Sequence, residues 1–213
     1  GGGFSTNDSF DVGERILAPF LWKSKILTVD TLILSHPNAD HLNGLIYMAE
    51  HFRVKTLWTN GEKAPTLGYQ TLMETVSKKG ISTPSFETLA RFQNLNGVTL
   101  EILFPPRNFS APEGGYGSSD ANDNTLVVKL SYGVFSMLFP GDVEEKAETL
   151  MVKTLGDGLK SEILVAPHHG SKTSSTWDFL DRVKPETVII PAGYDNRFGF
   201  PHPTVFHRYQ KTG

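Results

Sequence analysis

The chain of 213 residues is 38% hydrophobic and 20% charged, which is ordinary for a globular protein. Its formal net charge of −3 gives no reason to expect a broad nucleic-acid-binding surface, although a local anion site remains open. The absence of cysteine excludes disulfides, thiolate zinc sites and a cysteine nucleophile. No apolar run approaches the roughly 18 residues that a membrane-spanning helix needs, and we expect one domain over residues 1–213.

Helices and strands are predicted to alternate through most of the chain. The first half is expected to hold a helix at 14–25, a strand at 29–34, a helix at 41–52, a strand at 54–58 and a helix at 69–79. Strands follow at 98–104, 125–130 and 134–139, then a helix at 143–155, a strand at 163–166, a helix at 176–183, a strand at 187–190 and a helix after residue 203. Residues 105–123, rich in Gly, Pro, Ser and Asn, are expected to form a loop, and a hairpin is expected around Gly133. Mixed sheets covered by helices, an α/β fold, are therefore predicted.

Histidines gather where predicted strands end. His36 and His41 follow the strand at 29–34, and Asn38 and Asp40 lie between them. Imidazole nitrogens and side-chain oxygens are ligands that zinc, manganese and iron accept, so this segment is a candidate metal site. The alternative is a turn in which Asp40 caps the next helix.

Two later strand ends carry similar groups. Asp142 follows the strand at 134–139, and its alternative role is again a helix N-cap. His168 and His169 follow the strand at 163–166, and no capping role accounts for this pair. His202 lies in a short loop rich in proline and glycine. Because strand ends converge at one edge of an α/β sheet, we expect a metal-dependent, two-metal hydrolase.

The residues after the histidine pair suggest an anion site. Ser171, Lys172 and Thr173 offer two hydroxyls and a positive charge, which suit a phosphate group. A structural role is also expected in this segment, because Ser175 and Asp178 have the spacing of a capping box. The remaining histidines, His51 and His207, are interpreted as structural or solvent-facing.

The metallo-β-lactamase superfamily is the family that these segments resemble. Its H-x-H-x-D-H motif is similar to residues 35–41 (SHPNADH), and its later aspartate motif to residues 139–142 (FPGD). More narrowly, residues 10–15 (FDVGER), 122–127 (NDNTLV) and 168–175 (HHGSKTSS) resemble the C-terminal domain of ComEC-type competence proteins, which are bacterial membrane channels for DNA. The resemblance extends from Phe10 to Pro203.

The resemblance implies an αββα sandwich whose first strands lie upstream of Gly1, so that the chain is a fragment of a larger protein. It also implies a nuclease that degrades DNA during competence DNA uptake. Such a domain acts on single-stranded DNA outside the bacterial cytoplasmic membrane and is tethered through a membrane channel domain of the same polypeptide. We expect one or two divalent metal ions, with manganese or zinc favoured.

The resemblance also implies a role for each candidate residue. The expected metal ligands are His36, Asn38, Asp40, His41, Asp142 and His169. Asp40, His168 and His202 are the expected catalytic residues: Asp40 orients water, and the histidines contact the phosphate or protonate the leaving oxygen. Ser171, Lys172 and Thr173 are the expected substrate-binding residues.

Two positions depart from the superfamily pattern. Asn38 stands where the motif has its second histidine, and Asn122 and Asp123 stand in the region of a third motif that usually supplies a histidine. Both departures weaken the first metal position. Two other functions therefore stay open: a hydrolase of small phosphodiesters or esters on the same fold, or a metal-depleted DNA-binding module.

Overall fold

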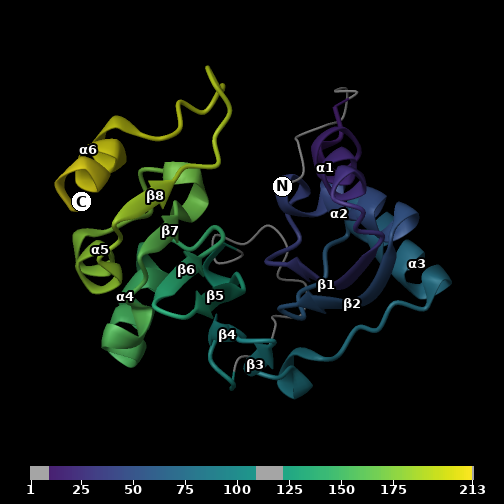
Figure 1. Ribbon diagram of the computed structural model, residues 1–213. Helices are drawn as coiled ribbons and strands as arrows, with labels where there is room; N and C mark the ends of the chain where they lie inside the picture. The colour runs from purple at the N-terminus through teal and green to yellow at the C-terminus, as the bar shows by residue number, and fades with distance from the viewer. Residues whose placement is uncertain (1–9, 109–121, 213) are drawn as a thin grey trace. The chain divides into compact units, whose positions relative to one another are not determined.

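The computed structural model describes residues 10–108 and 122–212 (Figure 1). These residues divide into two compact units. The first holds residues 10–89 and 108, and the second holds residues 90–107 and 122–212.

The first unit is a two-stranded parallel sheet with three helices. Its elements are a π-helical turn (Gly13–Leu17), α1 (Ala18–Lys23), β1 (Thr28–Leu34), α2 (Ala39–His51), β2 (Arg53–Thr59), α3 (Leu67–Lys79) and a short 3₁₀ turn (Phe86–Thr88). Thr28 pairs with Arg53 and Leu34 with Thr59, so α2 is the crossover of a βαβ unit. The core of this unit is formed by apolar residues of every one of these helices and strands, including Leu34, Leu42, Leu57 and Leu72.

The ends of α3 illustrate how local sequence sets the boundaries. The Thr66 hydroxyl accepts a hydrogen bond from the Tyr69 N–H at the N-terminal end. Gly80 has φ of +65° at the C-terminal end, where a residue without a Cβ adopts the left-handed conformation at low cost. This helix ends where the sequence predicts and begins two residues before the predicted start.

The second unit is a six-stranded mixed sheet in the order β3-β4-β5-β6-β7-β8. The strands are β3 (Phe92–Leu95), β4 (Val98–Phe104), β5 (Val127–Tyr132), β6 (Phe135–Phe139), β7 (Ile163–Val165) and β8 (Thr187–Ile189). The first three pairings are antiparallel, whereas β6 pairs with β7 and β7 with β8 in parallel. The carboxyl ends of β6, β7 and β8 therefore lie at the same edge of the sheet.

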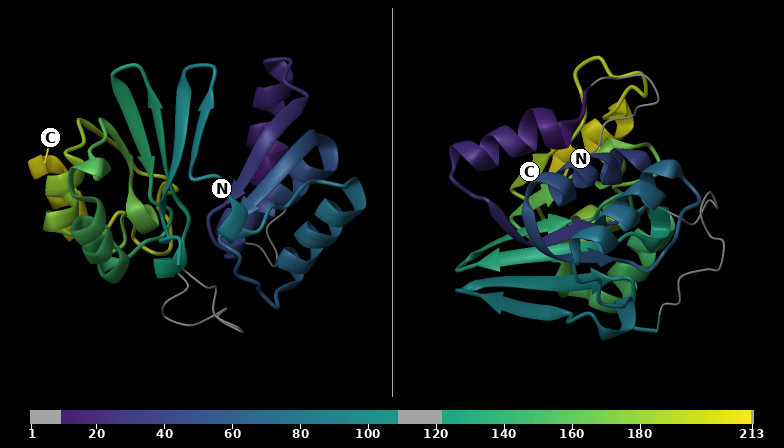
Figure 2. Two further views of the ribbon diagram at one scale, coloured as in Figure 1. Left: turned by 90° about the horizontal axis from the view of Figure 1, so that it is seen from below. Right: turned by 90° about the vertical axis from the view of Figure 1, so that its right-hand side faces the viewer.

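Three helices cover one face of this sheet (Figure 2). They are α4 (Glu145–Leu155), α5 (Trp177–Val183) and α6 (Pro203–Thr212). Short 3₁₀ turns occupy Asn122–Asn124, Gly156–Leu159 and Pro167–Gly170. The helices contribute Met151, Phe179 and Val205 to a single core with Leu138 and Leu164 of the sheet. Each of these five residues is fully buried, so the packing fixes the helices on this face of the sheet.

The predicted α/β class is confirmed, with helices and mixed sheets. The hairpin at Gly133 is present, since Tyr132 pairs with Phe135 across the turn. Strand β3 was not predicted, although the Asn96-Gly97 turn before β4 is a strong hairpin signal, and both turn residues have positive φ. The loop predicted at 105–123 is described only at its two ends, and residues 109–121 lie outside the described part. No helix among residues 10–108 and 122–212 is both long enough and apolar enough to cross a membrane.

Candidate metal centre

The first unit presents three metal-competent side chains directly after β1. His36 lies two residues beyond the end of the strand, and Asp40 and His41 lie in the first turn of α2. The three residues are called the N-terminal ligand cluster here. The His36 and His41 rings lie with centroids 4.1 Å apart, and His41 Nε2 lies 3.5 Å from Asp40 Oδ2. His36 has no solvent exposure, so its ring is held by the protein on all sides.

A single serine hydroxyl orients both imidazoles of this cluster. Ser35 Oγ lies 3.2 Å from His36 Nδ1 and 3.0 Å from His41 Nδ1. A hydroxyl has one proton to donate, so at least one of the two Nδ1 atoms carries its own proton and donates it to Ser35. A neutral ring protonated at Nδ1 presents a lone pair at Nε2, which is the form that binds metal. Sequence reasoning did not identify Ser35 in this role.

The capping interpretation of Asp40 is wrong. The N-cap of α2 is Asn38, whose backbone carbonyl accepts hydrogen bonds from the N–H groups of His41 and Leu42. Asp40 lies inside the first turn, where its negative charge suits the positive end of the helix dipole. The Asn38 side chain makes no capping hydrogen bond. Its assignment as a metal ligand stays a prediction.

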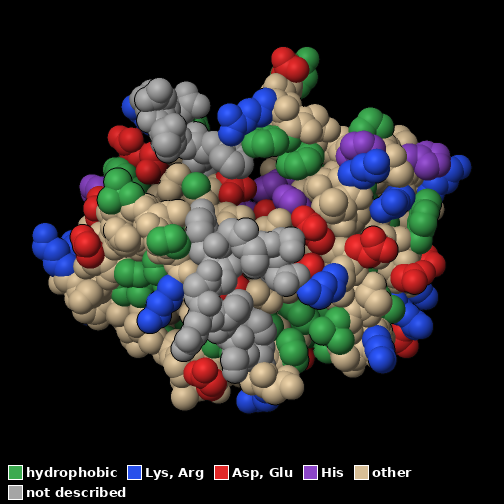
Figure 3. Space-filling view, turned by 180° about the vertical axis from the view of Figure 1, so that it is seen from behind, with side chains coloured by type: hydrophobic (Ala, Val, Ile, Leu, Met, Phe, Trp, Pro, Cys, Tyr) green, Lys and Arg blue, Asp and Glu red, His purple; other side chains and the backbone are tan. Residues whose placement is uncertain are grey.

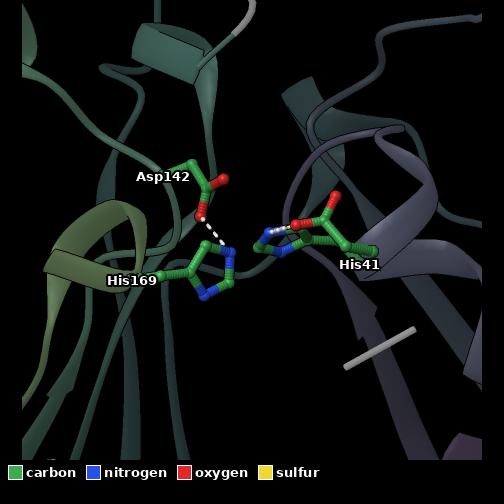
Figure 4. A group of neighbouring side chains, drawn as sticks. His41, Asp142 and His169 are labelled. Atoms are coloured by element: carbon green, nitrogen blue, oxygen red, sulfur yellow. Dashed lines mark ion pairs between the residues drawn. The ribbon is translucent and has the colours of Figure 1, made fainter. Parts of the chain in front are cut away.

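The second unit presents Asp142, His168 and His169 at the carboxyl ends of β6 and β7. These three residues are called the C-terminal ligand cluster here. The His168 N–H donates to the Gly141 carbonyl over 3.0 Å, which joins the two turns that carry them. His169 Nε2 lies 3.8 Å from Asp142 Oδ1, a pair drawn in Figure 4, and His168 Nε2 lies 3.9 Å from Asp142 Oδ2. Asp142 is only 3% exposed.

The two histidines of this cluster have different partners. His169 Nδ1 donates to the Pro191 carbonyl over 3.0 Å, since a carbonyl only accepts, and its Nε2 lone pair then faces Asp142. His168 Nδ1 instead lies 3.1 Å from the carboxylate oxygen Oε1 of Glu144. A carbonyl or carboxylate that accepts a hydrogen bond from the second ring nitrogen is the usual support of a metal-binding histidine. Of these two contacts, only that of His169 has the geometry of a hydrogen bond. These contacts favour His169 as the ligand and leave His168 for contact with substrate.

Phe200 packs against both histidines. Its ring is stacked on His169 with centroids 6.1 Å apart and meets His168 edge-on at 5.9 Å. The loop that carries it approaches Gly170 so closely that a Cβ there would lie 2.7 Å from Pro201 Cβ. Gly170 also has φ of +84°, so both the space and the backbone conformation require glycine. The sequence gives no signal for Phe200, because its contacts are long-range.

The capping interpretation of Asp142 is also wrong, because Asp123 occupies that role. Asp123 Oδ1 accepts hydrogen bonds from Glu144 N at 3.0 Å and Ala147 N at 3.3 Å, at the start of α4. Burial is the main cause that raises the pKa of the Asp123 carboxyl. Asn122 Nδ2 donates to Glu144 Oε1 over 3.2 Å. The segment where the superfamily usually has a third histidine motif therefore supports α4 and Glu144 here, and α4 begins two residues later than predicted.

The backbone of the histidine pair is strained. His168 and His169 have φ values of +46° and +56°, a region that costs non-glycine residues of order 1–3 kcal/mol each. Such a turn persists only where its surroundings hold it. Ser174 provides part of this support, because its hydroxyl lies 2.8 Å from the Pro167 carbonyl and 3.0 Å from the Ser171 carbonyl.

A buried carboxylate anchors the loop that follows. Glu148 of α4 has no solvent exposure and accepts hydrogen bonds from Ser175 N at 2.5 Å and Thr176 N at 2.8 Å. Burial raises the pKa of Glu148 to about 7, and the N–H donors and Arg208 offset only part of that effect. Ser175 in turn bonds the Tyr209 hydroxyl over 2.6 Å. Residues 170–176 are thus tied to α4 and α6.

The predicted capping box of Ser175 and Asp178 is not formed. Thr176 is the N-cap of α5, and its hydroxyl accepts from Phe179 N over 3.4 Å. Ser175 lies outside the helix with φ of +57°, because Glu148 and Tyr209 hold it there. The exposed positions of His51 and His207 agree with a structural or solvent-facing role.

The predicted substrate-binding residues form a compact turn after the histidine pair. Ser171 is 8% exposed, and its hydroxyl lies 3.0 Å from the Thr173 hydroxyl. Lys172 and Thr173 are exposed. The backbone N–H of His202 donates to the Gly170 carbonyl over 2.8 Å. The ring Nδ1 of His202 accepts a hydrogen bond from the backbone N–H of Thr204 over 3.3 Å. The neutral His202 ring therefore carries its remaining proton on Nε2.

The chemistry of each cluster fits a divalent metal ion. In the C-terminal ligand cluster, an imidazole lone pair and a carboxylate oxygen face each other at 3.8 Å, and two such acceptors repel unless a cation or proton lies between them. In the N-terminal ligand cluster, two rings oriented from behind by a hydroxyl accompany a carboxylate. Imidazole nitrogens and carboxylate oxygens are the ligands that zinc and manganese accept.

Two curated bacterial proteins are similar to nearly the whole of this chain. ComE operon protein 3 of Bacillus subtilis is 29% identical to this chain over 202 residues, covering 95% of the chain and 25% of that protein. Recombination protein 2 of Haemophilus influenzae is 30% identical over 202 residues, covering 93% of the chain and 22% of that protein. Both are ComEC-type competence proteins, which confirms the narrower resemblance. The chain thus spans about a quarter of the length of these curated relatives.

A solved structure supports the fold alone. CmlA of Streptomyces venezuelae, a diiron β-hydroxylase, aligns with a TM-score of 0.50 at 14% identity and covers 88% of this chain and 43% of that one. A family model described as the metallo-beta-lactamase superfamily matches residues 5–193. Because that match spans most of the sequence and the fold agrees, the chain belongs to the metallo-β-lactamase superfamily, whose fold is in general that of metal-dependent hydrolases.

Proposed function

We propose that the chain is a metal-dependent phosphodiesterase, a nuclease that degrades DNA during competence DNA uptake. The observation that carries this proposal is the pairing of an imidazole lone pair with a carboxylate at the ends of β6 and β7. Superfamily membership supports the hydrolytic chemistry, and the similarity to competence proteins supports the proposed setting. The family match runs through both units, which supports one domain over residues 1–213.

The proposed metal ligands come from both clusters. They are His36, Asp40, His41, Asp142 and His169, with Asn38 as a weaker sixth, and they would hold one or two divalent ions, manganese or zinc. A bound divalent ion supplies Lewis acidity toward a phosphoryl oxygen and makes a hydroxide nucleophile available near neutral pH. Asn38 offers only an amide oxygen where an imidazole is usual, so the first metal position is the weaker one.

The remaining residues act on the substrate. Asp40 accepts a hydrogen bond from the attacking water and orients it. His168 Nδ1 lies 3.1 Å from Glu144 Oε1, and its Nε2 exchanges a proton with the leaving oxygen. His202 is a second donor to the phosphate through Nε2. Ser171 shapes the turn, and Lys172 and Thr173 bind the phosphate from their exposed positions.

The proposed partners are single-stranded DNA and a membrane channel domain of the same polypeptide. The proposed location is the extracytoplasmic side of the bacterial cytoplasmic membrane, where such a channel would tether the chain. On the face drawn in Figure 3, basic side chains are interspersed with acidic ones. A surface on which positive and negative charges are mixed favours a few local contacts with the DNA strand over binding through a broad positive surface.

The direct test is cleavage of two substrates by the full chain after loading with manganese or zinc. A labelled single-stranded oligonucleotide tests the nuclease, and bis(p-nitrophenyl) phosphate tests the wider phosphodiesterase activity. We expect both to be cleaved, and Asp142→Ala to stop both. Cleavage of the small ester alone would reject the nuclease and retain the phosphodiesterase, whereas cleavage of neither by metal-loaded protein would reject both.

A further inference from the structure

A pocket of about 270 Å³ lies in the second unit, beside the turn that carries the histidine pair. It is lined by the start of α4, the segment 172–174, the start of α5 and Arg208 of α6. Neither metal-ligand cluster contributes a residue to the lining. Lys172 and Thr173, the proposed phosphate-binding residues, belong to the lining, so the pocket adjoins the proposed site, but its other side chains have no role in the proposed hydrolysis.

The pocket combines an aromatic ring with two positive charges. The Trp177 indole is 46% exposed at the start of α5, and an exposed ring of this size is suited to stacking on a flat ligand. Lys172 is exposed. Arg208 is held in place, because its Nη1 donates to the carbonyls of Ser174 at 3.2 Å and Ser175 at 2.9 Å. The guanidinium is thus fixed before any ligand arrives.

Two carboxylates complete the lining. Glu145 opens α4, and Asp178 follows Trp177 in the first turn of α5. Two positive and two negative side chains disfavour a bare anion, since attraction and repulsion nearly cancel. A ligand that carries both an anionic group and N–H donors satisfies all four. A nucleotide has this chemistry, because its phosphate is anionic and the amino groups of its base donate to carboxylates.

The pocket is also close enough to the histidine pair to hold the same strand. Lys172 is three residues after His169, and consecutive Cα atoms are 3.8 Å apart, so their Cα atoms are separated by at most about 11 Å. The intervening turn is fixed by the contacts of Ser171 and Ser174. A single strand bound at the histidine pair would reach the pocket within a few nucleotides.

We propose that this pocket binds one nucleotide of a single-stranded nucleic acid, with the base stacked on Trp177 and the phosphate held by Lys172 and Arg208. Glu145 and Asp178 accept hydrogen bonds from amino groups of the base. The inference rests on the proposed nuclease function and names the subsite that binds the strand beside the cleaved bond. Stacking on an aromatic ring together with backbone cations is the general mode of single-strand binding.

Binding without cleavage tests the pocket independently of catalysis. The full chain is freed of metal with EDTA, and fluorescence anisotropy measures its Kd for a labelled deoxycytidine oligonucleotide of about 12 nucleotides. We expect Trp177→Ala to raise Kd by about 5- to 100-fold and Trp177→Phe, which retains an aromatic face, by much less. An abasic oligonucleotide of the same length should bind the wild type and Trp177→Ala equally, because no base remains to stack.

The positive charges of the pocket should make oligonucleotide binding depend on the salt concentration. Lys172→Ala should lower the slope of log K against log salt by about 0.7, the loss of one phosphate contact. Lys153→Ala is the matched control, since Lys153 is exposed on α4 and outside the pocket, and it should leave both Kd and slope unchanged. Unchanged binding in Trp177→Ala and Lys172→Ala would overturn the proposal, as would the absence of oligonucleotide binding by the wild type. In either case, cleavage of bis(p-nitrophenyl) phosphate would still support the proposed hydrolase.

Discussion

The two ligand clusters are built in contrasting ways. In the N-terminal ligand cluster, a strand, a short turn and the first turn of α2 bring three candidate ligands together within six residues, and Ser35 orients the two histidines. The C-terminal ligand cluster joins Asp142 to histidines 26 and 27 positions later, in a strained backbone held from several elements. The first cluster depends on local sequence, and the second depends on the fold. Substitutions in the two clusters should therefore have different effects on metal affinity and on stability.

The largest expected effect is on metal affinity. Asp142→Ala should weaken manganese binding by at least about 1,000-fold, because outer-shell partners alone typically contribute 10- to 100-fold and a direct ligand exceeds them. Isothermal titration calorimetry measures the change. Asp181→Ala, an exposed aspartate of α5, is the control and should bind metal as the wild type does. Equal affinity in the two variants would remove Asp142 from the ligand set.

Removal of the buried Glu148 carboxylate should lower the stability of the fold that supports the C-terminal ligand cluster. Glu148→Ala leaves the N–H groups of Ser175 and Thr176 without their acceptor, so we expect the free energy of unfolding to fall by about 3 kcal/mol. Urea denaturation measures it. Glu145→Ala, exposed on the same helix, should cost less than about 1 kcal/mol. If the two variants were equally stable, the fold-dependent account of the C-terminal ligand cluster would fail.

The metal affinity of the N-terminal ligand cluster should depend on the Ser35 hydroxyl. Ser35→Ala removes the partner of both Nδ1 atoms, and we expect metal affinity to fall by about 10- to 100-fold with little change in stability. Ser35→Thr keeps the hydroxyl and should restore most of the affinity. The combination of calorimetry and denaturation checks both halves of this prediction. A loss of stability as large as that of Glu148→Ala would show that the first cluster is no less dependent on the fold than the second.

The last prediction is a pH dependence of the stability of the second unit, which is small per pH unit. The pKa of Glu148 is about 7 in the folded chain, against an ordinary value of 4.5, so the native state binds more protons between these values. Its contribution to stability is fully present below about pH 4.5 and is lost as the pH rises through about 7, with a slope of at most about 1.4 kcal/mol per pH unit. Denaturation across this range should show that slope in the wild type and its absence in Glu148→Gln. Arg208 and Tyr209 are the charged and titratable groups that face Glu148 and are unchanged in the variant. Identical slopes would contradict the assignment.

The same contrast explains what the sequence could predict. The strands and helices beside His36 to His41 follow from hydrophobic periodicity and turn residues, so the position of these candidate ligands at the junction of β1 and α2 was predicted. Asp142 and the histidine pair were recognised by residue type, but their supports were not. Asp123 caps α4 from 21 and 24 positions away, and Phe200 packs on the histidines across the unit. No local pattern encodes contacts between such distant positions, and the capping box predicted at Ser175 failed because Glu148 and Tyr209 hold that residue outside the helix.

The most direct test of the account asks whether metal binding needs residues of both clusters. Calorimetric titration with manganese would compare the wild type, His41→Ala, His169→Ala and the double variant, with circular dichroism to confirm that each is folded. We expect at least about one tightly bound ion per wild-type chain and weaker binding in each single variant and in the double. Tight binding that survives either single substitution unchanged would contradict it.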